Sequence, residues 1–544
     1  MSYRIVRSSV VAAFSLASLF ALEAPKQAAG QLLRAASSPN TAAERSTDSD
    51  KNDKKEVPQK ENVLASATAS GAAGAAKAKP PAPAKQHKLG PLNVTINWRV
   101  RAETWDWFQP TSGDNTYAFT HSLLRVGIGQ KSENFEWFAE GAQDSILGLP
   151  DNAVAPGRQG QLGLGGTYFV ANGGGQNNAN GFAKQAYIAF KIPANGKLRL
   201  GRFTFLDGAE VTPKDKTLAT LISSRITQRL IGDFGFSAVQ RSYDGVQLGF
   251  NTGSSNFTFL GARPTRGVFQ IDGMGEVDVD LFNGAYTVPI TKKKTAGELR
   301  FFTLGYVDER ASVLKTDNRS VPARTADQRH IRIGTYGADY VHVFHTDHHG
   351  QFNALVWGAI QNGSWGVLTH RAGAFVGEVG WQPPVRVINP WFSAGYSYGS
   401  GDGNPNDTRH ETFFQVLPTP RPYARFPFYN MENNEDFYGT AVFRLPHALS
   451  VRSELHALRL ADAQDLWYTG GGAYQRQTFG YTGRTSNGNR SLANVWDVSL
   501  DCPLRYGFAV TTYYAHAWGK SLVNNIYPAG GSGQFGYVET NFRF

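Results

Sequence analysis

Arginine recurs along this chain in runs where every second residue is apolar. In an extended strand, such arginines share one face and the apolar residues share the other. Guanidinium groups around the constriction of a water-filled pore attract carboxylates and offer them bidentate hydrogen bonds. The candidate residues for such a pathway are Arg99, Arg101, Arg125, Arg199, Arg241, Arg332 and Arg452, with Arg459 added if a bulge lies near Ala457.

The same polar face also carries acids: Glu136, Glu140, Glu454, Asp497, Asp501 and Glu539. A strongly anion-selective pore is expected to be more one-sided in charge. The arginines therefore have a second interpretation, in which they pair with these acids and hold the wall of the pore together.

Two other motifs offer metal ligands, and both are incomplete. Asp402-x-Asn404-x-Asn406 resembles half of a calcium loop, but it lacks the glycine, and Phe413 stands where the bidentate Glu belongs. The histidines of 345–350 lack the spacing of a zinc motif.

The chain contains no Gly-x-Ser-x-Gly, His-Glu-x-x-His or phosphate-binding loop. We therefore expect no metal, no cofactor and no enzymatic activity. A barrel hydrolase with Ser and His on adjacent strands stays open as an alternative.

Period-two alternation is the main pattern from Asn93 onward, and turn residues interrupt it. It indicates strands, but it does not choose between two folds. A soluble sandwich buries the apolar face, whereas a membrane barrel turns that face to lipid. Similar alternation recurs at 94–101, 124–129, 186–200, 246–250, 331–343, 496–501 and 508–514.

The end of the chain favours the barrel. Counting back in twos from Phe544 gives an uncharged face up to the last residue. Termini usually fray, but the last strand of an outer-membrane barrel pairs with the first and meets lipid. The ending also resembles the signal that the barrel insertion machinery recognises, so we expect Phe544 to be read by that machinery. About 450 residues, at roughly 25 per strand and connection, predict 16–18 strands.

The amino-terminus predicts export. Arg4 and Arg7 precede a short apolar run and small residues, which is typical of a signal peptide over 1–24. Residues 25–90 are rich in Ala, Lys and Pro and hold no aromatic residue, which predicts a disordered periplasmic tail. The barrel is predicted over 91–544. Residues 1–90 carry 13 Lys and Arg against 7 Asp and Glu, so +6 of the net +10 lies there and +4 remains.

The run 449–460 changes phase, because Leu458 and Leu460 fall on the polar side and Arg459 on the apolar side. One extra residue in a bulge would return Arg459 to the polar face. The alternative is that the strand ends there.

Long irregular stretches at 143–181, 207–240, 310–328 and 401–436 predict extracellular loops. Within the second, Leu218, Leu221, Ile222, Ile226 and Leu230 have helical spacing. They predict a short helix that folds over or into the pore, or packs on its own loop.

Several blocks resemble the alginate-export family of outer-membrane barrels. They are Leu198–Arg202, then Arg229–Ser237 followed by Arg241–Leu248, then Ser400–Asp407 followed by Thr412–Phe414. The resemblance covers roughly 93–544. It implies a monomeric barrel of about 18 strands that exports an anionic polysaccharide through an arginine-rich lumen. Arg202 departs from the pattern, since it shares the apolar phase of Leu198 and Leu200.

Together these observations predict an all-β transmembrane antiparallel barrel in the cell outer membrane. The predicted function is a channel that passes anionic polysaccharide, oligosaccharide or other anionic solutes by passive diffusion. A general diffusion porin without polysaccharide specificity is the alternative. The expected partners are outer-membrane lipid and an anionic saccharide or small anionic solute, with no nucleic acid.

Overall fold

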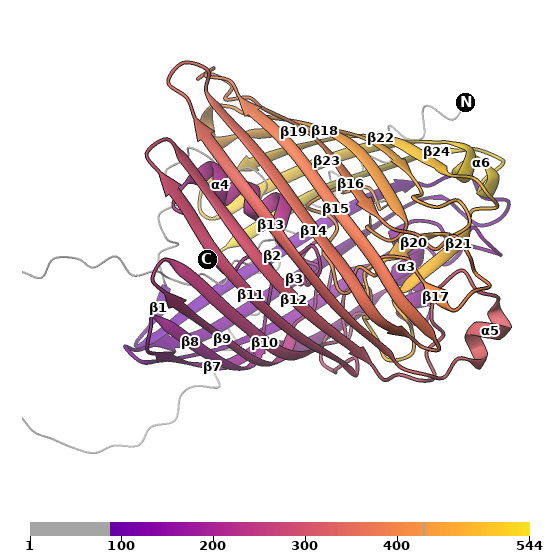
Figure 1. Ribbon diagram of the computed structural model, residues 1–544, viewed down its shortest axis with the longest axis horizontal. Coiled ribbons are helices and arrows are strands. Elements are labelled where there is room, and N and C mark those ends of the chain that lie inside the picture. Colours follow the sequence, from indigo (N-terminus) through magenta and orange to yellow (C-terminus); the bar gives the residue numbers. More distant parts are fainter. Residues whose placement is uncertain (1–86, 428–429) are drawn as a thin grey trace, which may run out of the picture. The chain divides into compact units, whose positions relative to one another are not determined.

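The computed structural model describes residues 87–427 and 430–544. Within this part, 18 antiparallel strands close into a barrel (Figure 1), which confirms the predicted fold class and strand number. The predicted signal peptide and the predicted tail as far as residue 86 lie outside the described residues. Strand β1 (His87–Leu89) falls in the range predicted as tail and pairs with the start of β2. No helix among the described residues is long and apolar enough to cross a bilayer.

The barrel strands follow one another around the wall in chain order, each pairing with the next. Their bounds are β2 (Leu92–Asp106), β3 (Thr116–Lys131), β4 (Phe135–Leu147), β7 (Asn178–Ile192), β8 (Gly196–Phe203), β9 (Tyr243–Thr252), β10 (Ser255–Pro264), β11 (Val279–Lys292), β12 (Thr295–Asp308), β13 (Ile331–His345), β14 (Gln351–Trp365), β15 (Leu368–Gln382), β16 (Trp391–Gly399), β18 (Asn434–Arg444), β19 (Ser450–Arg459), β22 (Ser491–Pro503), β23 (Phe508–Gly519) and β24 (Ser532–Arg543).

Strand β24 closes the barrel on β2. Their register pairs Trp98 with Phe542 and Thr104 with Gly536. The last residue completes the seam, because the N–H of Phe544 donates to the carbonyl of Ile96 at 2.9 Å and the N–H of Ile96 donates back at 3.0 Å. The chain end is therefore part of the closed wall, as its alternation predicted.

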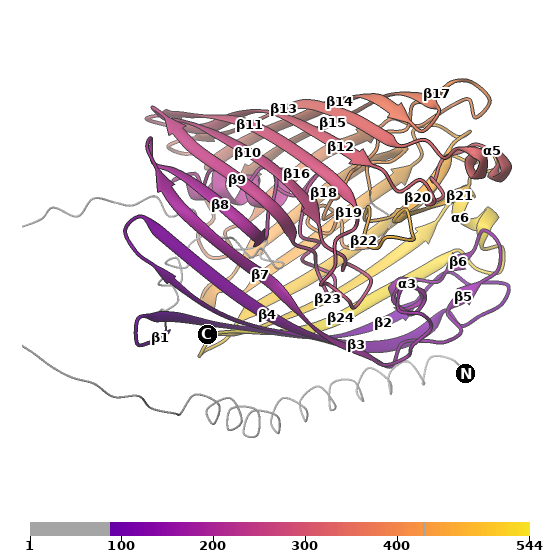
Figure 2. The same cartoon turned by 90° about the horizontal axis from the view of Figure 1, so that it is seen from below.

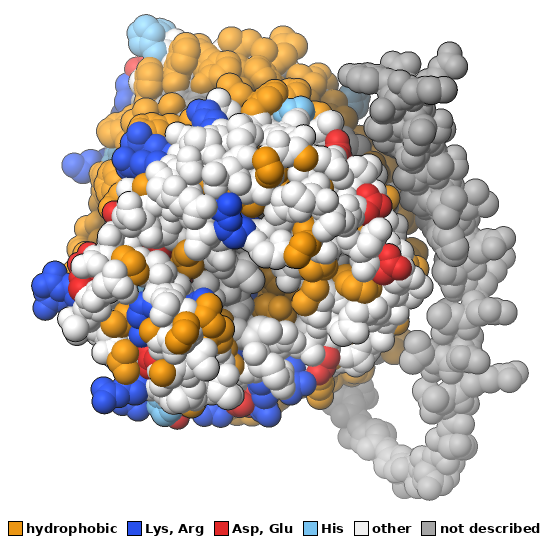
Figure 3. All heavy atoms as spheres, turned by 90° about the vertical axis from the view of Figure 1, so that its right-hand side faces the viewer, with side chains coloured by type: hydrophobic (Ala, Val, Ile, Leu, Met, Phe, Trp, Pro, Cys, Tyr) orange, Lys and Arg blue, Asp and Glu red, His pale blue; other side chains and the backbone are white. Residues whose placement is uncertain are grey.

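On most strands the apolar residues face outward and the polar residues face the interior, as predicted. On β3, Val126 and Ile128 are exposed on the outside, whereas Arg125 is buried inside. On β19, Leu455 is exposed and Arg452 is buried. Figure 3 shows hydrophobic side chains gathered on the side wall, with charged side chains around the rim of the end that faces the viewer. An apolar outer band and a polar interior are what lipid and lumen require.

Strand β13 reverses the expected phase. Ile331, Ile333, Val341 and Val343 are buried inside the barrel, and Arg332 points outward. The physical reason is that the lumen is filled at these positions, so apolar side chains are buried there by packing. Helix α4 (Lys216–Leu221) packs on β13 from inside.

The two ends of the barrel differ in the length of their connections. One end has short turns, such as 132–134, 193–195, 253–254 and 293–294, and the other has long loops. Outer-membrane barrels have short periplasmic turns and long extracellular loops, so we name the ends accordingly.

The predicted loops correspond to the connections 148–177, 204–242, 309–330 and 400–433. The first and last were predicted too long, because β4, β7 and β18 continue into polar residues that face the interior. The sequence did not predict the long connections at 265–278 and 460–490.

Short helices and strands lie in the connections between barrel strands (Figures 1 and 2). They are β5 (Val154–Ala155), β6 (Gly160–Gln161), α3 (Leu164–Ala171), α5 (Val321–Ala326), β17 (Arg409–His410), η2 (Pro446–Ala448), β20 (Leu466–Gly470), β21 (Tyr481–Thr485) and α6 (Ser521–Ile526).

Two extracellular connections fold inward and fill the lumen, and we call residues 204–242 and 410–427 the lumen plug. The first contains α4 and a π-helical turn, η1 (Ile222–Ile226). Backbone hydrogen bonds join the two segments, from Gly232 N–H to the Leu417 carbonyl at 2.9 Å and from Leu417 N–H to the Leu230 carbonyl at 2.8 Å. In Figure 1, α4 lies between the front and back walls.

The helix predicted from apolar spacing therefore forms and folds into the pore. Its apolar residues Leu218, Leu221, Ile222 and Ile226 are buried, and so is Leu230, which lies beyond the end of η1.

Candidate functional site

Two arginines of β2 hold the backbone of the lumen plug. The guanidinium of Arg99 donates to the carbonyls of Gly235 and Ser237. Arg101 donates from Nη1 to the Phe236 carbonyl at 2.9 Å, and its Cζ stands 3.9 Å from the centre of the Phe236 ring. Both side chains face the lumen and are buried, as predicted.

Arg101 also pairs with an acid of the wall. Its Nε donates to Glu539 Oε2 at 2.7 Å, and Nη1 lies 3.4 Å from Glu103 Oε1. The second interpretation from the sequence therefore holds at this residue, because it pairs with lumenal acids.

Three other predicted arginines lie inside the barrel. Arg125 is buried on the lumen face of β3. Arg199 on β8 donates to the side-chain oxygen of Gln247 and to the Thr204 carbonyl, the latter at 3.2 Å. Arg241 belongs to the lumen plug and donates to the Gly471 carbonyl at 2.6 Å.

Arg452 joins a network that fixes η1 to the wall. Arg225 of η1 lies 3.1 Å from Glu378 Oε2 and 2.9 Å from Glu454 Oε1, and it also donates to Thr440 Oγ1 at 2.7 Å. Arg452 lies 2.5 Å from Glu454 Oε2. The plug is thus tied to β15, β18 and β19 by buried charges, whose loss is costly when one partner is removed.

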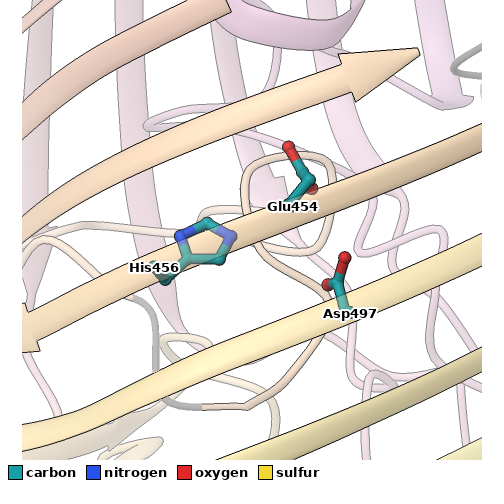
Figure 4. Close-up of side chains that lie close together, drawn as sticks. All are labelled: Glu454, His456 and Asp497. Atoms are coloured by element: carbon teal, nitrogen blue, oxygen red, sulfur yellow. The ribbon is translucent and has the colours of Figure 1, made fainter.

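Three side chains of this network could share a cation by geometry: Glu454, His456 and Asp497 (Figure 4). In Figure 4, both carboxylates and one edge of the imidazole lie on the same side of the wall. Each already has protein partners, since His456 Nδ1 lies 2.7 Å from Asp436 Oδ2 and Tyr513 donates to Asp497 at 2.9 Å. With two arginines on Glu454, the cluster is better described as an ion-pair network than as a metal centre.

A second network, which the sequence did not single out, anchors the plug to β12 and β13. Arg300 of β12 lies 2.8 Å from Glu210 of the plug and 3.3 Å from Asp339 of β13. Next to it, Asp207 accepts from the Ile231 N–H at 2.9 Å. Burial raises the pKa of Asp207 to about 7, although Arg300 opposes this rise.

Two predicted pathway residues lie outside the barrel, so their assignment to the lumen was wrong. Arg332 points outward near the extracellular end of β13, where its side chain is 64% exposed and lies 3.4 Å from Glu309. Arg459 also points outward and pairs with Glu435. The register shift lies where predicted, between Leu458 and Arg459 against β22, but β19 keeps its own phase.

Arg202 takes the outward position that its phase predicted. It lies 2.6 Å from Asp244, near the extracellular end of β8, and the strand has no register shift there. An ion pair at this end keeps the charge near the rim.

Other arginines were missed because they lie in segments without alternation or at a strand end. In the plug, Arg421 donates to the Phe426 carbonyl at 3.0 Å, and Arg425 stands over Tyr513. Their pKa values move in opposite directions: burial lowers that of Arg421 to about 10, whereas nearby Tyr537, Asp501 and Asp497 outweigh burial and raise that of Arg425. The pair of arginines in Arg-Pro-Tyr-Ala-Arg was the available signal.

A pocket that is partly open to solvent remains between the plug and the periplasmic part of the wall. Thr220 and Ser224 line it from the plug. The wall contributes Glu378, Trp391, Ser393, Arg444 and Arg452 among its lining residues.

The chain is similar to several solved structures at low sequence identity. Acinetobacter baumannii OccAB4 matches with a TM-score of 0.49 and 9% identity, covering 85% of this chain and 99% of that one. The outer membrane protein OpdK of Pseudomonas aeruginosa matches with a TM-score of 0.48 and 8% identity, covering 83% of this chain and 99% of that one. No curated protein matches the sequence.

The family model described as alginate export matches residues 92–519, which span the barrel from β2 to the end of β23. The match agrees with the predicted resemblance, and the family and the fold together confirm the outer-membrane location and the channel class. They point to a channel and not to an enzyme. The chain belongs to the alginate export family.

Proposed function

We propose that this channel passes anionic polysaccharide or oligosaccharide chains by passive diffusion along the arginines of its lumen. The supporting observation is the kind of acceptor that these arginines contact. Arg452 pairs with Glu454, but Arg99 and Arg241 donate to the backbone carbonyls of Gly235 and Gly471. Carbonyls are neutral acceptors, so they leave the positive charge of the lumen in place.

Carboxylates of a passing chain would be stronger acceptors for the same donors. Hydrogen bonds from arginine to carboxylate are charge-assisted and roughly twice as strong as neutral ones. The substrate-pathway residues under this proposal are Arg99, Arg101, Arg125, Arg199, Arg241 and Arg452. Because the plug fills the lumen, conduction requires that its segments move from the wall.

A general diffusion porin is the second candidate, and the lumenal acids favour it. Glu103, Glu378 and Asp497 are buried inside the barrel beside the arginines. A lumen of mixed sign selects weakly between ions.

Two further assignments complete the proposal. The channel acts as a monomer, and its terminal Phe544 is the feature that the barrel insertion machinery recognises. The position of Phe544 at the closing seam is consistent with both.

Reversal potentials in planar bilayers under a potassium chloride gradient, combined with liposome swelling, test the substrate. We expect anion-selective current and faster entry of a galacturonate trimer than of a neutral galactose trimer of equal length. Equal entry of the two trimers would favour the general porin, and cation-selective current would overturn the anionic assignment.

A further inference from the structure

We propose that the cavity under η1 is a binding site for one carboxylated sugar unit on the periplasmic side of the plug, with Arg444 as its anion-binding residue. This inference rests on the proposed function for the identity of the ligand. It adds a defined site to a general pathway.

Arg444 is the last residue of β18, on the lumen face at the periplasmic end. Its side chain lines the cavity and the residue is 8% exposed. Its Cζ stands 5.1 Å from the centre of the Trp391 ring, and its Nε is buried without a hydrogen-bond partner. Within the described residues, no carboxylate lies within 4.0 Å of this guanidinium.

The other charges of the cavity are already compensated. Glu378 is bound by Arg225 and accepts from the Tyr438 hydroxyl at 2.9 Å. Arg452 and Arg225 share Glu454. Arg444 is therefore the surplus positive charge, and a buried charge without a counterion is costly.

The rest of the lining suits a sugar. Thr220, Ser224 and Ser393 bring hydroxyl groups, and Leu221 and Val442 bring apolar surface. A carboxylate supplies the missing acceptor for Arg444. The hydroxyls of Thr220 and Ser224 donate to the carbonyls of Lys216 and Thr220, so each offers ring hydroxyls an acceptor oxygen.

Titration calorimetry on the full chain in detergent tests the site, with galacturonate trimer and neutral galactose trimer as probes. Arg444→Gln removes the charge. Arg505→Gln is the matched control, because Arg505 is exposed in a turn at the same end of the barrel. The gel shift between heated and unheated samples verifies that each variant is a closed barrel.

We expect the wild type to bind the galacturonate trimer and not the neutral trimer. Arg444→Gln should weaken binding at least about tenfold, because it leaves the buried carboxylate of the ligand without its positive partner. Arg505→Gln should bind as the wild type does, and Arg444→Lys should recover part of the loss. Unchanged affinity in Arg444→Gln, or equal binding of both trimers by the wild type, would overturn the site.

The bilayer experiment distinguishes this failure from failure of the proposed function. If wild-type current is anion-selective while Arg444→Gln binds normally, the channel assignment stands and only the site is wrong. If Arg444→Gln loses binding in a cation-selective channel, the site stands and the transport proposal is wrong.

Discussion

Arg101 holds Phe236 at two points, through a 2.9 Å hydrogen bond to its carbonyl and through its guanidinium 3.9 Å from the ring centre. One residue belongs to the first strand of the wall and the other to the lumen plug. The contact between Arg101 and Phe236 therefore shows directly that this part of the plug lies against the wall.

Arg99→Met should loosen the plug, because it removes the donors to the carbonyls of Gly235 and Ser237. Each hydrogen bond from a charged group contributes about 1.5–3 kcal/mol, so the open population should rise about tenfold or more. Single-channel conductance measures the change. Arg332→Met, on the outer face, is the control, and an Arg99→Met channel as closed as the wild type would contradict the anchoring role.

Arg125→Glu should move ion selectivity toward cations, because the side chain faces the lumen. The reversal potential under a salt gradient measures this shift. The same change at Arg459 should leave the potential unaltered, since Arg459 points outward and pairs with Glu435. If both variants shift equally, the effect comes from the overall charge of the barrel and not from the pathway.

Raising the pH should weaken the packing of the plug, because Asp207 then becomes charged. Burial raises its pKa from 3.8 to about 7, against the lowering effect of Arg300. A folded-state pKa above the ordinary value means that the stabilising contribution is complete below 3.8 and is lost as pH rises through about 7. Conductance should therefore increase from about pH 5 to about pH 8.

Asp207→Asn should flatten this pH profile, because the amide does not titrate. Asp151→Asn, an exposed loop residue, should retain it. A profile unchanged by Asp207→Asn would assign the pH dependence to another group.

Deleting Phe544 should lower the yield of closed barrels, because it removes the two hydrogen bonds to Ile96 and the terminal aromatic residue. The fraction that migrates as a compact band without heating measures closure. Purified chain refolded into detergent isolates closure from recognition, since no insertion machinery is present. Loss in cells with normal refolding in detergent would assign Phe544 to recognition alone.

Alternation predicted strands and the inward side of Arg99, Arg125 and Arg452, whereas the end of the chain favoured the barrel and the chain length predicted roughly 16–18 strands. The rule works where the outside is lipid and the inside is polar. It failed on β13, where the plug makes the interior apolar at Ile331 and Ile333 and leaves Arg332 outside. Alternation shows only that the two faces of a strand differ in polarity. Whether lipid, water or protein covers each face depends on the rest of the fold.

The plug contacts were beyond the reach of local pattern. Arg225 and Glu454 are 229 residues apart, and only the closed barrel brings them together. The helical spacing around Leu221 predicted a short helix and left open whether it entered the pore. The spacing specifies one face of a helix, and the partner of that face is set by tertiary packing.

The anchors on Gly235 and Ser237 recognise main-chain oxygens, which every amino acid possesses. The hydrogen bond from Arg99 therefore does not depend on the side chain at position 237, whereas the Ser237 hydroxyl itself accepts from the Gln240 N–H at 2.9 Å. The side chains of the plug can therefore vary while the plug keeps the same position against the wall. Exchange of plug side chains would then change which solutes pass through the lumen, while the two hydrogen bonds from Arg99 continue to hold the plug.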